Sequence, residues 1–340
     1  MTMSAPHPET WLKPVPGGLY CVPGDFFIDP TRRAERAVVT HGHSDHARAD
    51  NGAVLATAET IAIMRHRLGE RAGASHQALA YGETVQIGEV DVRLLPAGHV
   101  LGSAQVVMDW KGSRAVVSGD YKRRADATCA PFEPVQCDVF VTEATFGLPV
   151  FRHPPDGEEI DKLLHALRLY PERCVLVGVY SLGKAQRVLA LIRARGHDAP
   201  IYLHGAIAAM CTLYEGFGQR FGDIRPWQGV AKDDLKGHII LAPPGVTADL
   251  WARKLPDPVV AMASGWMRVK QRAKQRSVEL PLVISDHADW DELIRTIDDV
   301  AAPEIWVTHG AEEALIRQAT LTGRRARALR LVGLGEEEET

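Results

Sequence analysis

The sequence of 340 residues predicts a mixed α/β protein. Up to about residue 147, short apolar or β-branched runs alternate with turn residues, a pattern typical of strands. From about Gly157, helical periodicity alternates with continuous apolar runs, which is typical of a doubly wound α/β unit around a buried parallel sheet. After Leu280, strand and helix patterns alternate again in a shorter block. The change of pattern near residue 150 indicates a domain boundary.

The first region is expected to consist mainly of strands. The apolar runs that predict them are 26–29, 37–40, 54–57, 84–88, 90–95, 104–110, 114–119 and 138–143. Glycine-bearing connections at 87–89 and 111–113 suit hairpins between neighbouring runs. One helix is expected here, from about Glu59 to Leu68.

In the second region, the apolar positions of three segments recur at three- and four-residue steps, which predicts helices. These segments are 158–170, 184–196 and 206–218. The predicted strands around them are 174–180, 200–205, 238–245 and 259–265. The final block predicts strands at 281–287, 304–310 and 328–334, and helices at 290–301 and 311–322.

The composition disfavours several classes of protein. A formal net charge of −4 provides no chain-wide basic field, although a local basic groove is compatible with it. With 46% hydrophobic and 24% charged residues, the chain is expected to be globular. No apolar run reaches the roughly 18 residues of a spanning helix, and the N-terminus has no apolar signal region, so we expect a cytoplasmic protein without a membrane partner. Five scattered cysteines without a CxxC pair disfavour a disulfide scaffold and a thiolate zinc site.

The most informative segment is His41-Gly42-His43-Ser44-Asp45-His46, which directly follows the apolar run 37–40. Imidazole nitrogens and carboxylate oxygens are ligands of Zn²⁺ and similar cations. One catalytic cation needs about three protein ligands, so four ligand-type residues in one loop suggest two adjacent cations. Gly42 is expected to let the backbone turn sharply between the ligands.

Three further candidate ligands each follow an apolar run. They are His99, Asp120 and His309, at the C-terminal ends of predicted strands. A rigid sheet can hold several side chains at one place there. Each of these residues alone is more commonly a turn or capping residue. Their occurrence together with the histidine-rich loop favours a shared metal centre.

The segments HGHSDH, AGHVLGSA and SGDYKR resemble the signature ligand set of the metallo-β-lactamase superfamily. Three later segments, VTEATFG, ISDHADW and VTHG, are similar to the extra motifs of its β-CASP nucleases. The segment SGWM (264–267) is most similar to the bacterial DNA-ligase-associated exonucleases. The resemblance implies a four-layer αββα metallo-β-lactamase fold in residues 1–150 and 281–340. It also implies an inserted doubly wound α/β β-CASP domain in residues 151–280.

The same resemblance implies two divalent metal ions as cofactors, with zinc expected and manganese as the alternative. The implied ligands are His41, His43 and His99 for the first ion, Asp45, His46 and His309 for the second, and Asp120 as the bridge. Asp29, at the end of the run 26–29, is expected to support these ligands through hydrogen bonds.

The family resemblance also assigns catalytic roles to three residues, namely Asp45, Glu143 and His287. Two metal ions can supply hydroxide near neutral pH and neutralise a phosphate oxygen. His287, oriented by Glu143, then fits the role of the acid that protonates the leaving oxygen. Alternatively, Glu143 is a helix cap or a loop carboxylate, and His287 merely begins a helix that a neighbouring aspartate caps.

Candidate substrate-binding residues occur in two places of the α/β region. Ser181, Lys184 and Arg187 lie where a helix begins after a strand, and the free N–H groups of such a helix can hold a phosphate. The alternative is an ordinary strand-to-helix crossover.

The second place is a run of alternating basic residues, namely Lys270, Arg272, Lys274 and Arg276. In an extended backbone all four would point to one side and form a stripe along a nucleic-acid backbone. On a helix they would be dispersed over a solvated face. Trp266, which precedes this run, either stacks on a base or packs in the core.

We therefore expect a two-metal nuclease that acts on DNA rather than RNA, as an exonuclease in DNA repair, in functional association with an ATP-dependent DNA ligase. The alternative is a ribonuclease similar to ribonuclease J. The inserted α/β region and the Glu143/His287 pair disfavour a small-molecule metallo-hydrolase of the same superfamily. A non-catalytic nucleic-acid-binding scaffold is disfavoured because every expected ligand is present.

Overall fold

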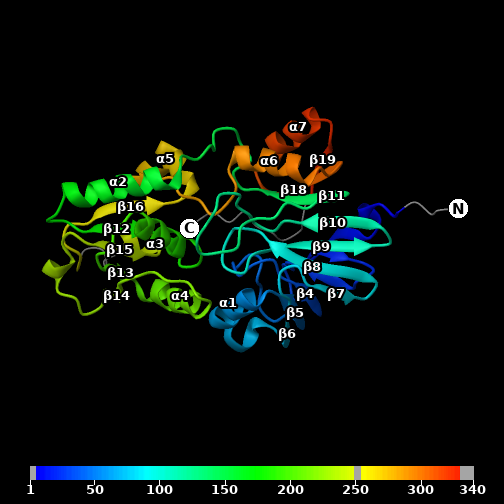
Figure 1. Ribbon diagram of the computed structural model, residues 1–340, viewed down its shortest axis with the longest axis horizontal. Helices are drawn as coiled ribbons and strands as arrows, with labels where there is room; N and C mark the ends of the chain where they lie inside the picture. Colours follow the sequence, from blue (N-terminus) through cyan, green and yellow to red (C-terminus); the bar gives the residue numbers. More distant parts are fainter. Residues whose placement is uncertain (1–4, 249–253, 330–340) are drawn as a thin grey trace. The chain divides into compact units, whose positions relative to one another are not determined.

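The computed structural model describes residues 5–248 and 254–329. The chain forms two compact units (Figure 1). Unit 1 contains the chain up to Val150 and again from His287, whereas unit 2 contains Phe151–Asp286. Unit 2 is thus an insertion within the sequence of unit 1.

The first sheet of unit 1 has the strand order β1-β2-β3-β4-β5-β6. Its strands are β1 (Leu12–Val15), β2 (Gly18–Cys21), β3 (Phe26–Ile28), β4 (Arg36–Val38), β5 (Ala53–Ala56) and β6 (Ser75–Ala78). β1, β2 and β3 pair in antiparallel fashion, and the remaining neighbours pair in parallel. The β1–β2 hairpin was not among the predicted strands, because Lys13 and Pro14 interrupt the apolar run of β1.

The second sheet of unit 1 has the strand order β19-β18-β11-β10-β9-β8-β7. Its strands are β7 (Thr84–Ile87), β8 (Val90–Pro96), β9 (Ala104–Trp110), β10 (Ser113–Val117), β11 (Val139–Ala144), β18 (Glu304–Gly310) and β19 (Arg325–Ala328). The two predicted hairpins, β7–β8 and β9–β10, are present, with Gly88 and Gly112 at positive φ. β10, β11, β18 and β19 pair in parallel, so strands from before and after the insertion share one sheet. The later part of the strand predicted at 328–334 lies outside the described residues.

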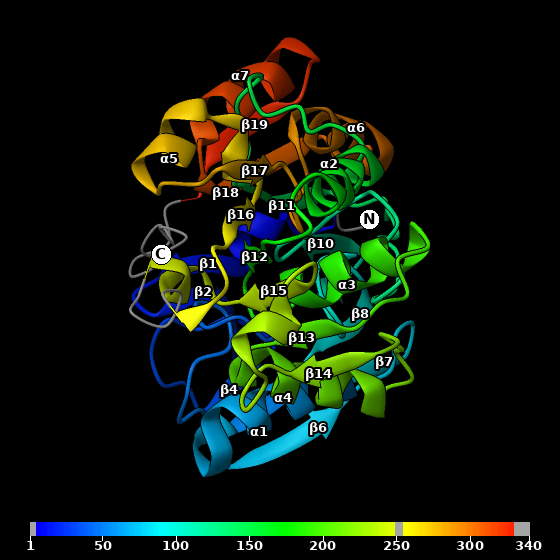
Figure 2. The ribbon, with the colours of Figure 1, turned by 90° about the vertical axis from the view of Figure 1, so that its left-hand side faces the viewer.

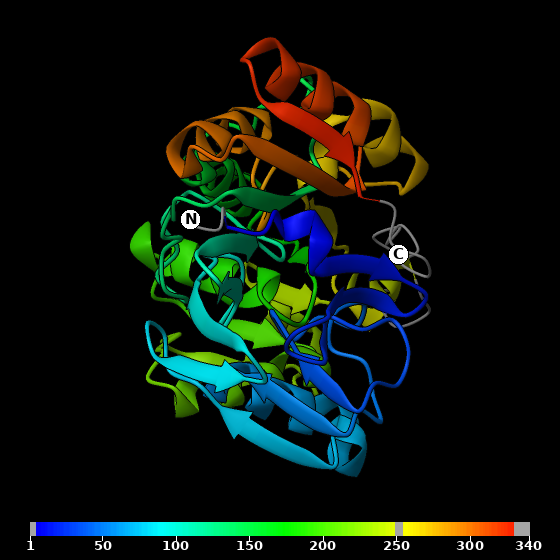
Figure 3. The same ribbon diagram turned by 90° about the vertical axis from the view of Figure 1, so that its right-hand side faces the viewer.

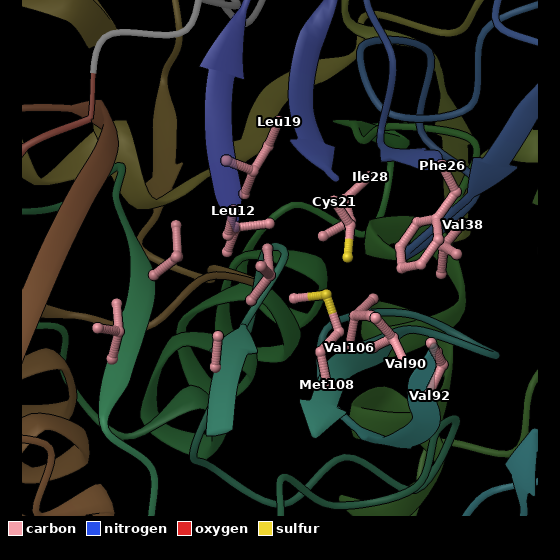
Figure 4. Close-up of a cluster of buried hydrophobic side chains, with 14 of the residues drawn as sticks. Leu12, Leu19, Cys21, Phe26, Ile28, Val38, Val90, Val92, Val106 and Met108 are labelled. Atoms are coloured by element: carbon pink, nitrogen blue, oxygen red, sulfur yellow. The ribbon is translucent and has the colours of Figure 1, made fainter. Parts of the chain in front are cut away.

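In the described part of unit 1 the α-helices are α1 (Ala58–Leu68), α6 (Trp290–Val300) and α7 (Glu312–Leu321). One apolar cluster joins the facing sides of the two sheets, with Leu19 and Phe26 opposite Val92 and Met108 (Figure 4). A second cluster packs α6 and α7 on the other face of the second sheet (Figure 3). A third packs α1 on the first sheet. These layers leave the ends of β4, β8, β10 and β18 to carry polar loops.

Unit 2 has a parallel sheet with the strand order β14-β13-β15-β12-β16-β17 (Figure 2). Its strands are β12 (Val175–Gly178), β13 (Ile201–Leu203), β14 (Ile224–Pro226), β15 (Ile239–Ala242), β16 (Val259–Ala263) and β17 (Leu280–Leu282). Its α-helices are α2 (Asp156–Leu169), α3 (Lys184–Ala194), α4 (Gly205–Gly216) and α5 (Lys270–Gln275). The central strands β12 and β15 are buried along their whole length, as continuous apolar runs require.

Short 3-10 helices complete the described structure. They are η1 (Pro8–Thr10), η2 (Gly69–Ala72), η3 (Lys232–Leu235), η4 (Pro244–Ala248) and η6 (Gly265–Arg268). Among the described residues, every helix is too short or too polar to span a bilayer.

The extended backbone considered for the basic run Lys270–Arg276 is wrong, because α5 occupies Lys270–Gln275. Lysine, glutamine, arginine and alanine are strong helix formers. Ala273 is buried in a small cluster with Met262 and Met267, so one side of this short helix is anchored. Strict alternation of charge therefore does not indicate a strand here.

Candidate functional site

The histidine-rich loop lies directly after β4 and gathers its side chains at one point. His41 is fully buried, and His46 is 2% exposed. The Nδ1 atom of His43 lies 3.1 Å from Nε2 of His41 and 3.0 Å from Nε2 of His99. His99 follows β8, so two separate loops converge. His41, His43, His99 and Asp120 place one ligand atom each within 4.8 Å of one another.

Asp120, which follows β10, lies at the centre of this group. Its Oδ2 atom is 3.5 Å from His41 Nε2, 3.4 Å from His46 Nε2 and 3.9 Å from His99 Nε2. The Nε2 atom of His46 is in turn 3.1 Å from Oδ2 of Asp45. One carboxylate oxygen is thus shared by histidines of both predicted ligand sets.

His309, at the end of β18, also belongs to this group, although it follows the inserted unit in the sequence. Its ring stacks on His46 with ring centroids 5.3 Å apart. The Nε2 atom of His309 and the Oδ1 atom of Asp45 are buried and make no hydrogen bond to the described residues. A buried polar atom without a partner is costly, and a cation would satisfy both of these atoms. The donor set therefore fits a divalent metal ion.

The electrostatics of the group favour a positive charge among the ligands. Burial lowers the pKa of His41 well below its ordinary value and also lowers that of His309, so both rings are neutral donors. Burial would also lower the pKa of His46, but the carboxylates of Asp45, Asp120 and Asp29 raise it well above the ordinary value. A divalent cation meets the same demand for positive charge.

Asp29 holds this loop from the end of β3. Its Oδ1 atom accepts the Thr40 backbone N–H at 2.8 Å, and its Oδ2 atom accepts the Thr40 hydroxyl at 2.6 Å. The same Oδ2 atom lies 2.7 Å from Nδ1 of His46. Nε2 of His46 is thereby directed toward Asp45 and Asp120, as a supporting carboxylate would require. Thr40 was not singled out from the sequence, although its position directly before His41 was the available signal.

Glycines beside the candidate ligands permit close backbone approach. Gly98, Gly119 and Gly310 adjoin His99, Asp120 and His309, and all three have positive φ. A Cβ atom on Gly98 or Gly310 would lie less than 2.5 Å from a backbone carbonyl oxygen. Gly42 differs from the expectation, because its φ is not positive. A Cβ atom on Gly42 would instead strike the Ile63 side chain of α1, so the requirement is space rather than a sharp turn.

Glu143 and His287 form a pair beside the cluster. Nδ1 of His287 lies 3.0 Å from Oε2 and 3.2 Å from Oε1 of Glu143. Glu143 is 1% exposed at the end of β11, and its Oε1 also accepts the backbone N–H of Tyr121 at 2.8 Å. The ring centroids of His287 and His99 are 4.6 Å apart. The carboxylate thus orients the imidazole next to a candidate metal ligand.

The predicted phosphate-binding residues of unit 2 are mostly engaged inside that unit. Lys184 is fully buried at the start of α3. Its Nζ lies 2.5 Å from Oδ1 of Asp286 and 3.3 Å from the Ile284 carbonyl oxygen. Arg187 is 1% exposed and lies 3.6 Å from the carboxylate of Asp156. The carbonyl of Ser181 accepts a hydrogen bond from Gln186.

The four basic residues of the α5 segment, by contrast, are all exposed. Arg272 stacks over the ring of Trp266, with the guanidinium carbon 3.9 Å from the ring centroid. Trp266 is half-buried and meets Phe151 edge to face at a centroid distance of 5.0 Å. Trp266 is therefore neither fully buried in the core nor fully exposed to solvent.

Comparison with known proteins identifies relatives along most of the chain, although no family model matches it. A protein of Opitutus terrae named "Probable DNA ligase" is 29% identical over 95% of this chain, which corresponds to 31% of that protein. A ribonuclease of Thermus thermophilus is 25% identical over 92% of this chain and 89% of its own length. An endoribonuclease of Saccharomyces cerevisiae is 23% identical over 69% of this chain and 37% of its length.

The chain thus spans only about a third of the DNA ligase and of the yeast endoribonuclease. Among solved structures, a protein of unknown function from Enterococcus faecalis superposes with a TM-score of 0.61, covering 87% of this chain and 79% of that one. At 14% identity this match shows a common fold alone. Together with the histidine and aspartate motifs, these relatives support the similarity of the chain to the β-CASP nucleases of the metallo-β-lactamase fold.

Proposed function

We propose that the chain is a metal-dependent phosphodiesterase that degrades nucleic acid. The observation that carries this proposal is the Glu143–His287 pair, held at 3.0 Å beside a cluster of buried histidines and aspartates. The cluster alone would suit any hydrolase of the superfamily. His287, a further histidine oriented by its own carboxylate, adds the proton donor that a phosphodiester leaving group requires.

The fold supports the same assignment. In this proposal, unit 1 is the four-layer αββα metallo-β-lactamase domain, predicted as residues 1–150 and 281–340. Unit 2 is the inserted β-CASP domain, predicted as residues 151–280. The apolar clusters that join α1, the two sheets, and α6 with α7 support the layered arrangement. The parallel sheet of the inserted unit supports the doubly wound assignment.

Two divalent cations are the proposed cofactors, zinc before manganese, because two sets of donors share Asp120. His41, His43 and His99 would hold the first ion, and Asp45, His46 and His309 the second. When bound, such a pair lowers the pKa of water and neutralises a phosphate oxygen. Nitrogen and oxygen donors without a thiolate fit both metals.

The residues of the chain then divide the remaining work. Glu143 holds Nδ1 of His287, so the proton for the leaving oxygen is carried at Nε2 of that ring. Asp29 and Thr40 fix the orientation of His46. Asp45 contributes a carboxylate oxygen as a ligand. Burial raises the pKa of the Asp45 carboxyl group, but His46 lowers it by more, so the group stays ionised. Phosphodiester hydrolysis needs these groups preorganised rather than mobile.

DNA is the proposed substrate, with exonucleolytic action in DNA repair and functional association with an ATP-dependent DNA ligase. The support is that the related region of the Opitutus terrae protein occurs within a polypeptide named as a DNA ligase. RNA is the second candidate, favoured by the ribonuclease of Thermus thermophilus, to which the chain is similar over 89% of that protein.

The exposed basic residues around α5, with Trp266, are proposed to bind the nucleic-acid backbone. Their side chains offer charge to phosphates, and the Arg272–Trp266 stack offers a flat surface for a base. Lys184 and Arg187 remain weaker candidates, because each forms an ion pair with a carboxylate within unit 2.

The test is parallel digestion of end-labelled DNA and RNA, single- and double-stranded, by protein purified without chelator, with metal content measured on the same sample. Shortening of labelled DNA from one end, with slower loss of RNA, supports the proposal. Faster cleavage of RNA would favour the second candidate. Failure to cleave any of the four substrates with Zn²⁺ or Mn²⁺ present would refute the nuclease assignment.

A further inference from the structure

Lys122 is a fully buried lysine in unit 1 that the proposed mechanism does not use. It lies two residues after Asp120, in the loop that follows β10. A buried ammonium group is expensive unless it is paired and hydrogen-bonded, so its contacts deserve a physical explanation. Its Nζ donates to the backbone carbonyl of His287 at 3.2 Å and lies 3.7 Å from Oε2 of Glu292.

The carbonyl that Lys122 holds belongs to the proposed proton donor. His287 is also the residue at which the chain re-enters unit 1 after the insertion. The N–H of the same peptide group, on Ala288, donates to the Tyr121 carbonyl at 2.6 Å. The peptide group that joins His287 to Ala288 is therefore held at both its C=O and its N–H by the two residues that follow Asp120.

The backbone of Lys122 reaches the His99 loop as well. Its N–H donates to the Ala97 carbonyl at 3.1 Å, and its own carbonyl oxygen lies 2.3 Å from the position that a Cβ atom on Gly98 would take. One residue thus touches the loop of a candidate metal ligand through its backbone and the loop of His287 through its side chain. No other lysine is fully buried among the described residues of unit 1.

Glu292 explains why the ammonium group is kept there. Its side chain forms a capping box at the start of α6, accepting the Asp289 N–H at 3.1 Å while Asp289 accepts the Glu292 N–H at 3.0 Å. Lys122 therefore links the fixed start of α6 to the His287 peptide. The charge of Glu292 offsets part of the cost of burying the ammonium group.

We propose that Lys122 is a positioning residue, which fixes the His287 peptide relative to the metal-ligand loops and so keeps the imidazole in register with Glu143. This role rests on the proposed function of His287. A displacement of about 1 Å at a reacting group can cost on the order of 100-fold in rate. The re-entry point of an inserted unit is where such a displacement would arise, because the chain on one side of His287 belongs to another unit.

The test uses the full-length chain with Lys122→Met, which is similar in length but cannot donate, and Lys122→Gln, which can donate without charge. Arg123→Met is the matched control. Arg123 is the neighbouring cation and ties the same loop to α6 through Asp299 at 2.6 Å, at a different place from His287.

The first readout does not need activity. In chelator-treated protein, the rate of carbethoxylation of His287 is followed by peptide mass spectrometry, with the exposed His165 of α2 as the internal reference. We expect a several-fold faster reaction in Lys122→Met, a smaller increase in Lys122→Gln, and no change in Arg123→Met. Equal rates in all four proteins, or the same increase in the Arg123→Met control, would overturn the proposal.

The second readout is turnover with metals bound. Lys122→Met should lower kcat on an oligonucleotide by up to about 100-fold with little change in KM, and Lys122→Gln should recover part of the loss. An activated aryl phosphodiester, whose leaving group needs no proton, should lose much less. Equal losses on both substrates would contradict a role through His287. If the wild-type protein cleaves no substrate, the proposed function fails, whereas the labelling result still decides the role of Lys122.

Discussion

The histidine-rich loop of unit 1 and the basic run of unit 2 are both dense patterns of polar residues, but their side chains are arranged differently in the structure. The loop at His41–His46 keeps its side chains converging on Asp120. The run at Lys270–Arg276 becomes helical, and its four basic side chains are dispersed. Buried partners such as Asp29 hold the loop in place, whereas Ala273 is the only buried residue of the run.

The difference shows what makes a motif informative about geometry. Six adjacent residues after a strand have little freedom to spread, and side chains that are buried must satisfy their polar atoms. Exposed charged side chains form hydrogen bonds with water equally well on a helix and on a strand. The spacing of exposed lysines and arginines therefore leaves their backbone undetermined.

The largest effect is expected for Asp120→Ala. Asp120 is the one carboxylate that approaches His41, His46 and His99 together, so its loss would remove the proposed shared ligand and leave the charge of both proposed cations uncompensated. We expect bound metal to fall well below the wild-type content and nuclease activity to become undetectable. Elemental analysis measures the first, and end-labelled digestion the second. Asp91→Ala, on the exposed side of β8, is the control. Retention of full metal content in Asp120→Ala would refute the bridging role.

His287→Ala should be nearly as damaging to turnover but not to metal binding. Its Nδ1 faces Glu143, and it is not in the set of proposed ligands. We expect kcat to fall by roughly 10²–10⁴-fold on an oligonucleotide, the range for loss of a general acid. Cleavage of an activated aryl phosphodiester should fall much less. His165→Ala, an exposed histidine of α2, should leave both rates unchanged. Loss of metal in His287→Ala would make this residue a ligand instead.

A third substitution tests whether the buried ammonium group of Lys184 stabilises unit 2 or binds nucleic acid. Lys184→Met leaves the carboxylate of Asp286 without the ammonium group that lies 2.5 Å away. Breaking a buried ion pair on one side typically costs about 3–5 kcal/mol. We expect a lower midpoint of denaturant unfolding, with partial recovery when Asp286→Asn is added. Unchanged stability together with weaker nucleic-acid binding would instead support the phosphate-binding role first considered for Lys184.

The smallest effect is expected from charge reversal on α5. Lys270→Glu with Lys274→Glu changes two exposed side chains one helical turn apart and leaves the Arg272–Trp266 stack intact. If both lysines contact phosphates of duplex DNA, the slope of log K against log salt should become shallower by roughly 2. Lys232→Glu with Lys236→Glu, at the first residue of η3 and at the residue that follows it, has the same sequence spacing and is the matched control. The same slope in both double variants would show that the α5 lysines are only solvated, and metal content should not change in either.

Much of the secondary structure could be predicted from periodicity, because buried strands and amphipathic helices repeat their apolar positions. The helices at α1, α2, α3, α4, α6 and α7 and the strands at β8, β9, β11, β12 and β15 lie where the patterns indicate them. The β1–β2 hairpin was not predicted, because Lys13 and Pro14 interrupt its apolar pattern, and the sequence left α5 open between a helix and an extended backbone, because the alternating basic residues suit either. Those contacts are supplied by other parts of the chain.

The sequence by itself determined which residues are chemically able to bind a metal, because histidine and aspartate side chains carry that ability wherever they lie. It also placed them after apolar runs, where strand ends collect polar groups. The resemblance paired Glu143 with His287, and the folded chain brings them to 3.0 Å. Only the tertiary structure decided that His309 stacks on His46 and that Lys122 holds the His287 carbonyl. These pairs are separated by more than 140 residues of chain. No local pattern encodes such distances, since they depend on β10, β11 and β18 lying side by side in one sheet.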